Sequence, residues 1–125
     1  MFETLEALCK GLNLIPGLAT CKIGYEAQIT PSDYPIARIV PVRIAPGKPY
    51  YNRTADTDIF FGVNITESEG LYNVYQDLFI LEEAILKVLK AQNIRYIETL
   101  TDQDRLATTY KLMSIRCEVQ AELLP

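Results

Sequence analysis

The chain contains no histidine and no tryptophan among its 125 residues. Histidine is the most frequent general base in enzymes and a common metal ligand, so its absence excludes every catalytic triad built on an imidazole. The sequence also lacks a Cys-x-x-Cys pair, a glycine-rich phosphate-binding loop and a Gly-x-Ser-x-Gly motif. These are the usual patterns of redox, nucleotide-dependent and acyl-transfer chemistry. We therefore predict a protein that is not an enzyme, with no catalytic residues, no metal site and no cofactor.

Long apolar runs and basic clusters are missing as well. No stretch approaches the ~20 apolar residues of a membrane-spanning helix, and residues 1–6 carry two glutamates where a signal peptide would be basic. The net charge is −4 and the isoelectric point is near 4.8. Because this charge repels phosphate groups, we expect no specific nucleic-acid binding. Since the sequence shows neither a membrane-spanning stretch nor a signal peptide, we expect no membrane contact and a location in the cytoplasm.

Cysteine is scarce: Cys9, Cys21 and Cys117 are the only three, and they are far apart. Each occupies an apolar position of its segment. An odd number at such spacing is untypical of a disulfide framework, so we predict buried free thiols.

What is present is the pattern of one small domain. The length, with 49% hydrophobic and 22% charged residues, fits a single α+β domain over residues 1–125. Apolar residues recur at helical spacing over residues 2–14, and Pro16 and Gly17 follow. Residues 19–29 alternate between apolar and polar, which predicts a strand with one buried face.

The remaining elements follow from the same periodicities. Residues 36–44 alternate through Pro41, which favours an edge strand or a bulge. Residues 45–57 are rich in Pro, Gly, Asn and Asp and predict a long inter-strand loop. A third strand at 59–65, a helix at 71–92 and strands at 94–100 and 112–121 complete the chain. This order predicts an α+β fold: an antiparallel or mixed β-sheet of about five strands, with one long helix and a short N-terminal helix packed on it.

Two aspartate pairs are the nearest approach to an acidic site. Asp102 and Asp104 lie in the turn between the last two strands, and Asp56 and Asp58 precede the third strand. Paired carboxylates can bind a divalent cation or act as an acid and a base. Aspartate is also typical of strand-connecting turns, because its side chain bonds nearby backbone N–H groups. We favour the turn interpretation.

The long helix carries more apolar surface than one sheet can bury. One stripe can cover the sheet: Leu71, Val74, Leu78, Leu81, Ile85 and Val88. Further apolar residues extend beyond it: Tyr72, Tyr75, Phe79, Ile80, Leu86 and Leu89. Two interpretations remain open, namely that the N-terminal helix and the long loop cover the excess, or that it forms a subunit interface.

Several segments together resemble the tail terminator (tail completion) proteins of long, non-contractile-tailed phages and prophages. The resemblance covers nearly the whole chain and follows the order of the elements. The segments that carry it include Tyr34-Pro35-Ile36-Ala37-Arg38-Ile39-Val40-Pro41, Tyr96-Ile97-Glu98, and Asp102 and Lys111 with Met113-Ser114-Ile115-Arg116.

The resemblance implies a structural subunit that forms a ring, expected to be a hexamer, at the head-proximal end of the virion tail. The ring ends polymerisation of the tail tube and provides the surface that joins the head. Its partners are then further copies of itself, the tail tube protein and the head–tail connector protein. We expect partner contacts at Lys48, Tyr50, Tyr51 and Arg53, and the subunit interface at Tyr72, Phe79, Glu83 and Lys87.

Other interpretations are consistent with the same residues. Tyr50 and Tyr51 beside basic residues can stack on bases or sugars, although half-apolar subunit contacts use tyrosine more often. Glu83 and Lys87 can form an ordinary solvent-exposed pair along the helix. The chain can also be a head–tail connector or stopper of the same particle, a monomeric binding module, or an enzyme that uses Asp102 and Asp104 with a metal ion.

Overall fold

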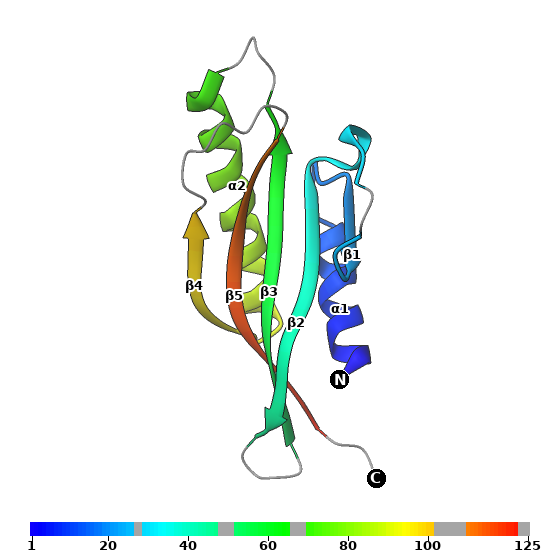
Figure 1. The fold of residues 1–125 in the computed structure, drawn as a ribbon. Coiled ribbons are helices and arrows are strands. Elements are labelled where there is room, and N and C mark those ends of the chain that lie inside the picture. The colour runs from blue at the N-terminus through cyan, green and yellow to red at the C-terminus, as the bar shows by residue number, and fades with distance from the viewer. Residues whose placement is uncertain (27–28, 48–51, 66–69, 102–109, 123–125) are drawn as a thin grey trace.

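The computed structural model describes residues 1–26, 29–47, 52–65, 70–101 and 110–122 (Figure 1). These residues form two helices and five strands in the predicted order, with a 3-10 turn at Pro31–Asp33. The helices are α1 (Phe2–Asn13) and α2 (Gly70–Ala91), and the strands are β1 (Thr20–Ile23), β2 (Ile36–Pro46), β3 (Asn52–Asn64), β4 (Arg95–Thr101) and β5 (Tyr110–Glu122). The predicted α+β fold is confirmed.

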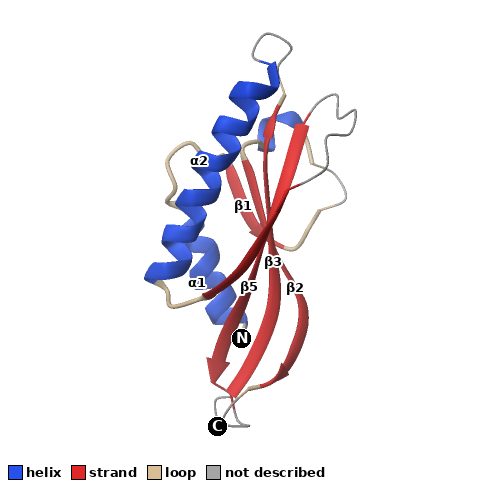
Figure 2. Cartoon of the chain, turned by 90° about the vertical axis from the view of Figure 1, so that its left-hand side faces the viewer, coloured by secondary structure: helices blue, strands red, loops and turns tan. Residues whose placement is uncertain are grey.

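The strands form one mixed sheet in the order β1-β2-β3-β5-β4. β1 runs parallel to β2, and all other neighbours are antiparallel. Both helices lie on the same face of this sheet (Figure 2). We call the opposite face, which Figure 1 presents to the viewer, the outer face. β4 forms one edge, whereas β1 covers β2 only from Ile36 to Ile39, so the rest of β2 is also an edge.

The predicted long loop at 45–57 is wrong. β2 continues to Pro46 and β3 begins at Asn52, so most of this segment belongs to a long β-hairpin. Its polar composition reflects a strand with two different faces: Ala55 and Thr57 are buried, and Asp56 between them lies on the outer face.

The first strand is shorter than the alternation of residues 19–29 predicts. β1 ends at Ile23, and Gly24 follows with φ 91°, a conformation that glycine adopts without steric cost. The chain then leaves the sheet ladder and crosses the outer face, where the Tyr25 ring packs edge-on against Phe60 with 5.7 Å between centroids.

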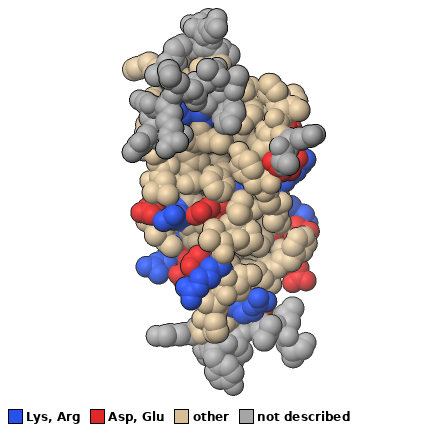
Figure 3. Space-filling view, in the orientation of Figure 1, with Lys and Arg blue, Asp and Glu red and all other residues tan. Residues whose placement is uncertain are grey.

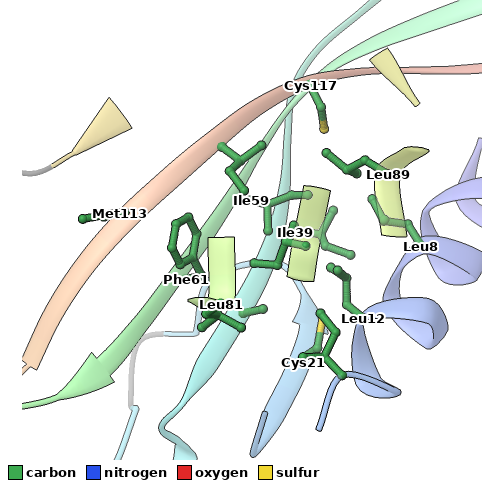
Figure 4. Close-up of a cluster of buried hydrophobic side chains, with 14 of the residues drawn as sticks. Leu8, Leu12, Cys21, Ile39, Ile59, Phe61, Leu81, Leu89, Met113 and Cys117 are labelled. Carbon is green, nitrogen blue, oxygen red and sulfur yellow. The ribbon is translucent and has the colours of Figure 1, made fainter. Parts of the chain in front are cut away.

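The core lies between the helices and the sheet (Figure 4). α1 contributes every third or fourth residue, Leu5, Leu8 and Leu12, all buried. The buried residues of α2 share one stripe: Val74, Leu78, Leu81, Ile85 and Leu89. The sheet supplies Ile39, Ile59, Phe61, Met113, Ile115, Cys117 and Val119 from its three central strands. Full burial of each such aliphatic side chain stabilises the fold by roughly 1.5–3 kcal/mol.

Candidate functional site

The four residues predicted as a subunit interface lie on one face of α2, directed away from the sheet. Tyr72, Phe79, Glu83 and Lys87 are all exposed, and their spacing of seven and four residues returns to the same side of a helix. Tyr72 is 83% exposed and the adjacent Ile80 is 61% exposed. We call these five residues the α2 outward face. Among the described residues, Glu83 and Lys87 form no ion pair, so no intrahelical bond accounts for them.

The N-terminal helix covers only part of the apolar excess of α2. Gln92 donates a hydrogen bond from Nε2 to the Ala7 carbonyl at 3.2 Å, which joins α1 to the C-terminal end of α2. There Leu89 is buried and Leu86 packs against the core. Nearer the start of α2, Tyr72 and Phe79 remain exposed. The N-terminal helix therefore covers the C-terminal half of α2, and the apolar side chains nearer the start of the helix stay exposed.

Phe79 is held in place by an aromatic neighbour. Its ring stacks on Tyr75 with 6.3 Å between the centroids and 25° between the planes. Lys111, which is buried on β5, places Nζ 5.2 Å from the centroid of the same Tyr75 ring. This cation–π contact and the stacking orient the exposed ring before any partner is present.

Of the four predicted partner-contact residues, the structure describes Arg53 alone. Lys48, Tyr50 and Tyr51 lie outside the described residues. Arg53 belongs to β3, where it is half-buried and lies opposite Pro46 and Ala121 in the ladder. The structure therefore places Arg53 in a strand, and the expectation that it belongs to a long loop is wrong.

The hairpin exposes apolar residues that the sequence analysis did not single out. Val42 is 63% exposed, and Ile44 is also exposed, at the side of β2 that no described strand covers. Arg43 between them is exposed and forms no ion pair with a described residue. A register shift between Pro41 and Arg43 marks this site as a β-bulge. The signal available in the sequence was the apolar pair Val42 and Ile44, which follows the proline that predicts an edge strand.

Charged side chains cross the outer face of the sheet as a band (Figure 3). Arg116 contacts Asp58 at 3.5 Å and Glu98 at 3.2 Å, and Arg95 approaches Glu118 at 3.7 Å. Asp58 is thus an ion-pair partner on a strand. Asp102 and Asp104 lie outside the described residues, and no group of metal-ligating residues occurs in the part of the chain that the structure covers.

Above this band, Arg38 is completely buried beneath the outer face. Its Nη1 donates hydrogen bonds to Thr20 Oγ1 at 3.0 Å and to the Ala37 carbonyl at 2.8 Å, and its Nη2 lies 2.8 Å from Glu26 Oε1. The guanidinium therefore fixes the chain after β1 to the sheet. A buried charge of this kind is held by its partners and stays out of reach of another molecule.

An apolar groove lies beside α2 on the helix-bearing side of the sheet. It has a volume of about 530 Å³, within the range of protein pockets that accept a ligand-sized group. The connection between α1 and β1 forms one wall, α2 forms the other, and the end of β3 forms part of the lining. Asp77 is the only charged lining residue, and it forms no ion pair with the residues described.

The three thiols, Cys9, Cys21 and Cys117, are free. Burial raises the pKa of Cys21 to about 12, with the neighbouring Cys9 thiol adding to the effect. Burial also raises the pKa of Cys117 to about 12. The predicted burial holds for Cys21 and Cys117, whereas Cys9 is half-buried, with its Sγ 3.8 Å from Cys21 Sγ. Thiols with raised pKa stay protonated at neutral pH and are poor nucleophiles.

Neither protein-family models nor curated protein sequences match this chain. Within the described segments, neither helix combines the length and the hydropathy that a membrane crossing requires. The α2 outward face, the exposed side of the hairpin and the apolar groove are the surfaces on which a function can be proposed.

Proposed function

We propose that this chain is a structural subunit of an oligomeric assembly, and specifically a phage tail terminator whose ring caps the tail tube. One observation carries the proposal: the subunit exposes apolar side chains on two separate elements, at the α2 outward face and along the uncovered part of β2. Isolated exposed apolar residues are ordinary, but clustered ones are typical of protein–protein contacts.

The two surfaces belong to different parts of the molecule, which suits a ring. A contact between two different surfaces of identical subunits is heterologous, and it closes into a ring when the rotation per subunit divides a full turn. Tyr72 and Phe79 are aromatic, the class of residue most enriched at the centre of interfaces. The exposed Glu83 and Lys87 at the same surface provide polar groups for the rim.

Termination would then follow from competitive binding at the end of the tube. The ring must bind the last ring of tail tube protein more tightly than another tube subunit does, while its other side recruits no tube protein and binds the head–tail connector protein instead. This mechanism needs two unlike ring faces and no chemical step. A head–tail connector or stopper of the same particle would use similar surfaces and is the alternative within this class.

The apolar groove favours a second candidate, a monomeric binding module. A groove of about 530 Å³ beside a single carboxylate can accept an extended peptide that carries a basic residue. This candidate predicts a subunit that remains monomeric at every concentration, whereas the terminator candidate predicts a closed oligomer.

Sedimentation velocity over a wide concentration range, with negative-stain imaging of the largest species, tests the proposal. We expect a ring of about six subunits. Phe79→Ala should weaken its formation, because it removes an aromatic contact, and Gln76→Ala, an exposed polar position on the same helix, is the matched control. A second experiment uses isolated tail tubes. The protein should bind at the ends of the tubes and stop their further growth.

A monomer that also fails to bind tube ends would refute the terminator role. A ring that binds the isolated head connector and ignores tail tubes would assign the chain to the connector class instead.

A further inference from the structure

The β2–β3 hairpin forms an arm that extends past the N-terminus of α1, as Figures 1 and 2 show from two sides. The exposed residues Val42, Arg43 and Ile44 lie on its uncovered edge. Pro41 and Pro46 stand in the same strand, and a proline on an edge disfavours the addition of another strand because it has no N–H group. A partner at this edge therefore contacts side chains on both sides of the strand. Ile44, opposite Ala55, faces the helix-bearing side. Val42 lines a hollow of the outer face, and Arg43, opposite Asp56, also faces that side and forms no ion pair with a described residue.

The apolar groove has the complementary composition. Its walls are made of Ile15, Pro16, Leu18, Ile80, Leu81 and Ala84. Ile80 is largely exposed at the groove, and Asp77 provides the single carboxylate. An occupant that buries aliphatic side chains and brings one cation would satisfy both features. The segment Val42-Arg43-Ile44 has this chemistry.

A subunit cannot fill its own groove with its own arm. Arg43 lies opposite Asp56 in the β2–β3 ladder, whereas the groove is lined by Asn64 at the far end of β3. These two positions are eight residues apart along one strand, or roughly 27 Å at the rise of an antiparallel strand. The contact must therefore join two copies of the chain.

We propose that the arm of one subunit docks in the groove of the next, with Val42 and Ile44 against the apolar walls and Arg43 beside Asp77. This inference rests on the proposed function, since it names the contact by which the subunits join. Because the arm and the groove are different surfaces, the contact is head-to-tail and repeats around a ring. Ile80 belongs both to the groove and to the α2 outward face, so the contact extends from the groove onto that face.

Charge reversal tests the pairing directly. Arg43→Glu and Asp77→Arg should each weaken self-association at least about tenfold, because each puts two like charges in contact. The double variant restores opposite charges and should recover the association to within about threefold of the unaltered protein. Lys90→Glu, an exposed reversal near the end of α2, is the control and should change little.

All variants are measured by sedimentation at one ionic strength, with circular dichroism to establish that each is folded. The inference is overturned if either single reversal leaves the oligomer intact, or if the double variant associates no better than the weaker single. In both cases self-association does not depend on this pair of residues. The proposed function is then decided by whether the protein binds to isolated tail tubes. A chain that is monomeric at every concentration also overturns the inference.

Discussion

Replacement of Arg38 by alanine tests how the segment after β1 is held on the sheet. The side chain is 0% exposed, and its Nη1 donates to Thr20 Oγ1 and to the carbonyl of Ala37. Its Nη2 lies 2.8 Å from Glu26 Oε1, in the part of the chain that crosses the outer face. Alanine would remove both hydrogen bonds and the ion pair and would leave a cavity beside Phe60, the residue opposite Arg38 in the ladder.

Variants of the two partners of this ion pair should lower the free energy of unfolding by different amounts. Arg38→Ala deletes a large buried side chain and both hydrogen bonds of Nη1, and we expect it to cost about 3–5 kcal/mol in the free energy of unfolding. Glu26→Gln keeps an oxygen near Nη2 but leaves the buried guanidinium without its counter-charge, so it should cost about 1–2 kcal/mol. Arg38→Met keeps most of the packing and should lie between them, at roughly 2–3 kcal/mol.

Urea unfolding, followed by far-ultraviolet circular dichroism, measures these changes. The set is the unaltered protein, Arg38→Ala, Arg38→Met, Glu26→Gln and the Arg38→Met/Glu26→Gln double variant. The double variant should be more stable than additivity predicts by at least about 0.5 kcal/mol, because the second change removes an interaction that is already lost. Strict additivity, or a Glu26→Gln cost near zero, would show that the guanidinium acts by packing alone and would refute the reasoning.

Three further predictions concern stability. Gly62→Ala should cost about 1–3 kcal/mol, because a Cβ there would approach the Lys111 backbone carbonyl and Leu112 too closely, and a urea midpoint well below that of the unaltered protein would establish it. Leu78→Ala, at a fully buried position of α2, should cost about 2–5 kcal/mol by the same measurement, and a loss below about 1 kcal/mol would contradict the packing described. Burial raises the pKa of Cys117 to about 12 from the usual 9.0, so the unfolded thiol ionises first. The stability from this thiol is complete below pH 9 and is lost as the pH rises toward 12, and unfolding midpoints at several pH values should show a shallower decline in Cys117→Ala.

Periodicity predicted most of this fold because most elements have only one hydrophobic pattern. The spacing of Leu5, Leu8 and Leu12 belongs to a helix with one buried side, and α1 has that side against the sheet. The alternation from Met113 to Val119 belongs to a strand, and β5 buries those residues beneath the helices. The local sequence is enough to predict the type of such an element, because each of them buries one face only and so has a single hydrophobic period.

Strand boundaries in the hairpin were beyond this reasoning for a physical reason. Thr54, Asp56 and Asp58 are polar because the outer face of β3 meets water and charged neighbours such as Arg116. A polar residue at every second position also occurs in loops, so composition alone favoured a loop at 45–57. Only the pairing with β2 and β5 on both sides shows that these residues belong to a central strand.

The predicted interface on α2 and the arm–groove pair differ in how far apart their residues lie in sequence. The α2 outward face belongs to one helix, so the helical repeat alone brought Tyr72, Phe79, Glu83 and Lys87 together. The groove is assembled from four separate segments, and Asp77 becomes significant only when it is the one charge among apolar walls. Arg43 likewise becomes significant only when both of its neighbours are seen to be exposed and the adjacent strand β1 is seen to stop short. The surfaces that best specify an assembly are therefore those whose residues the fold gathers, and charge reversal across Arg43 and Asp77 is the experiment that addresses them.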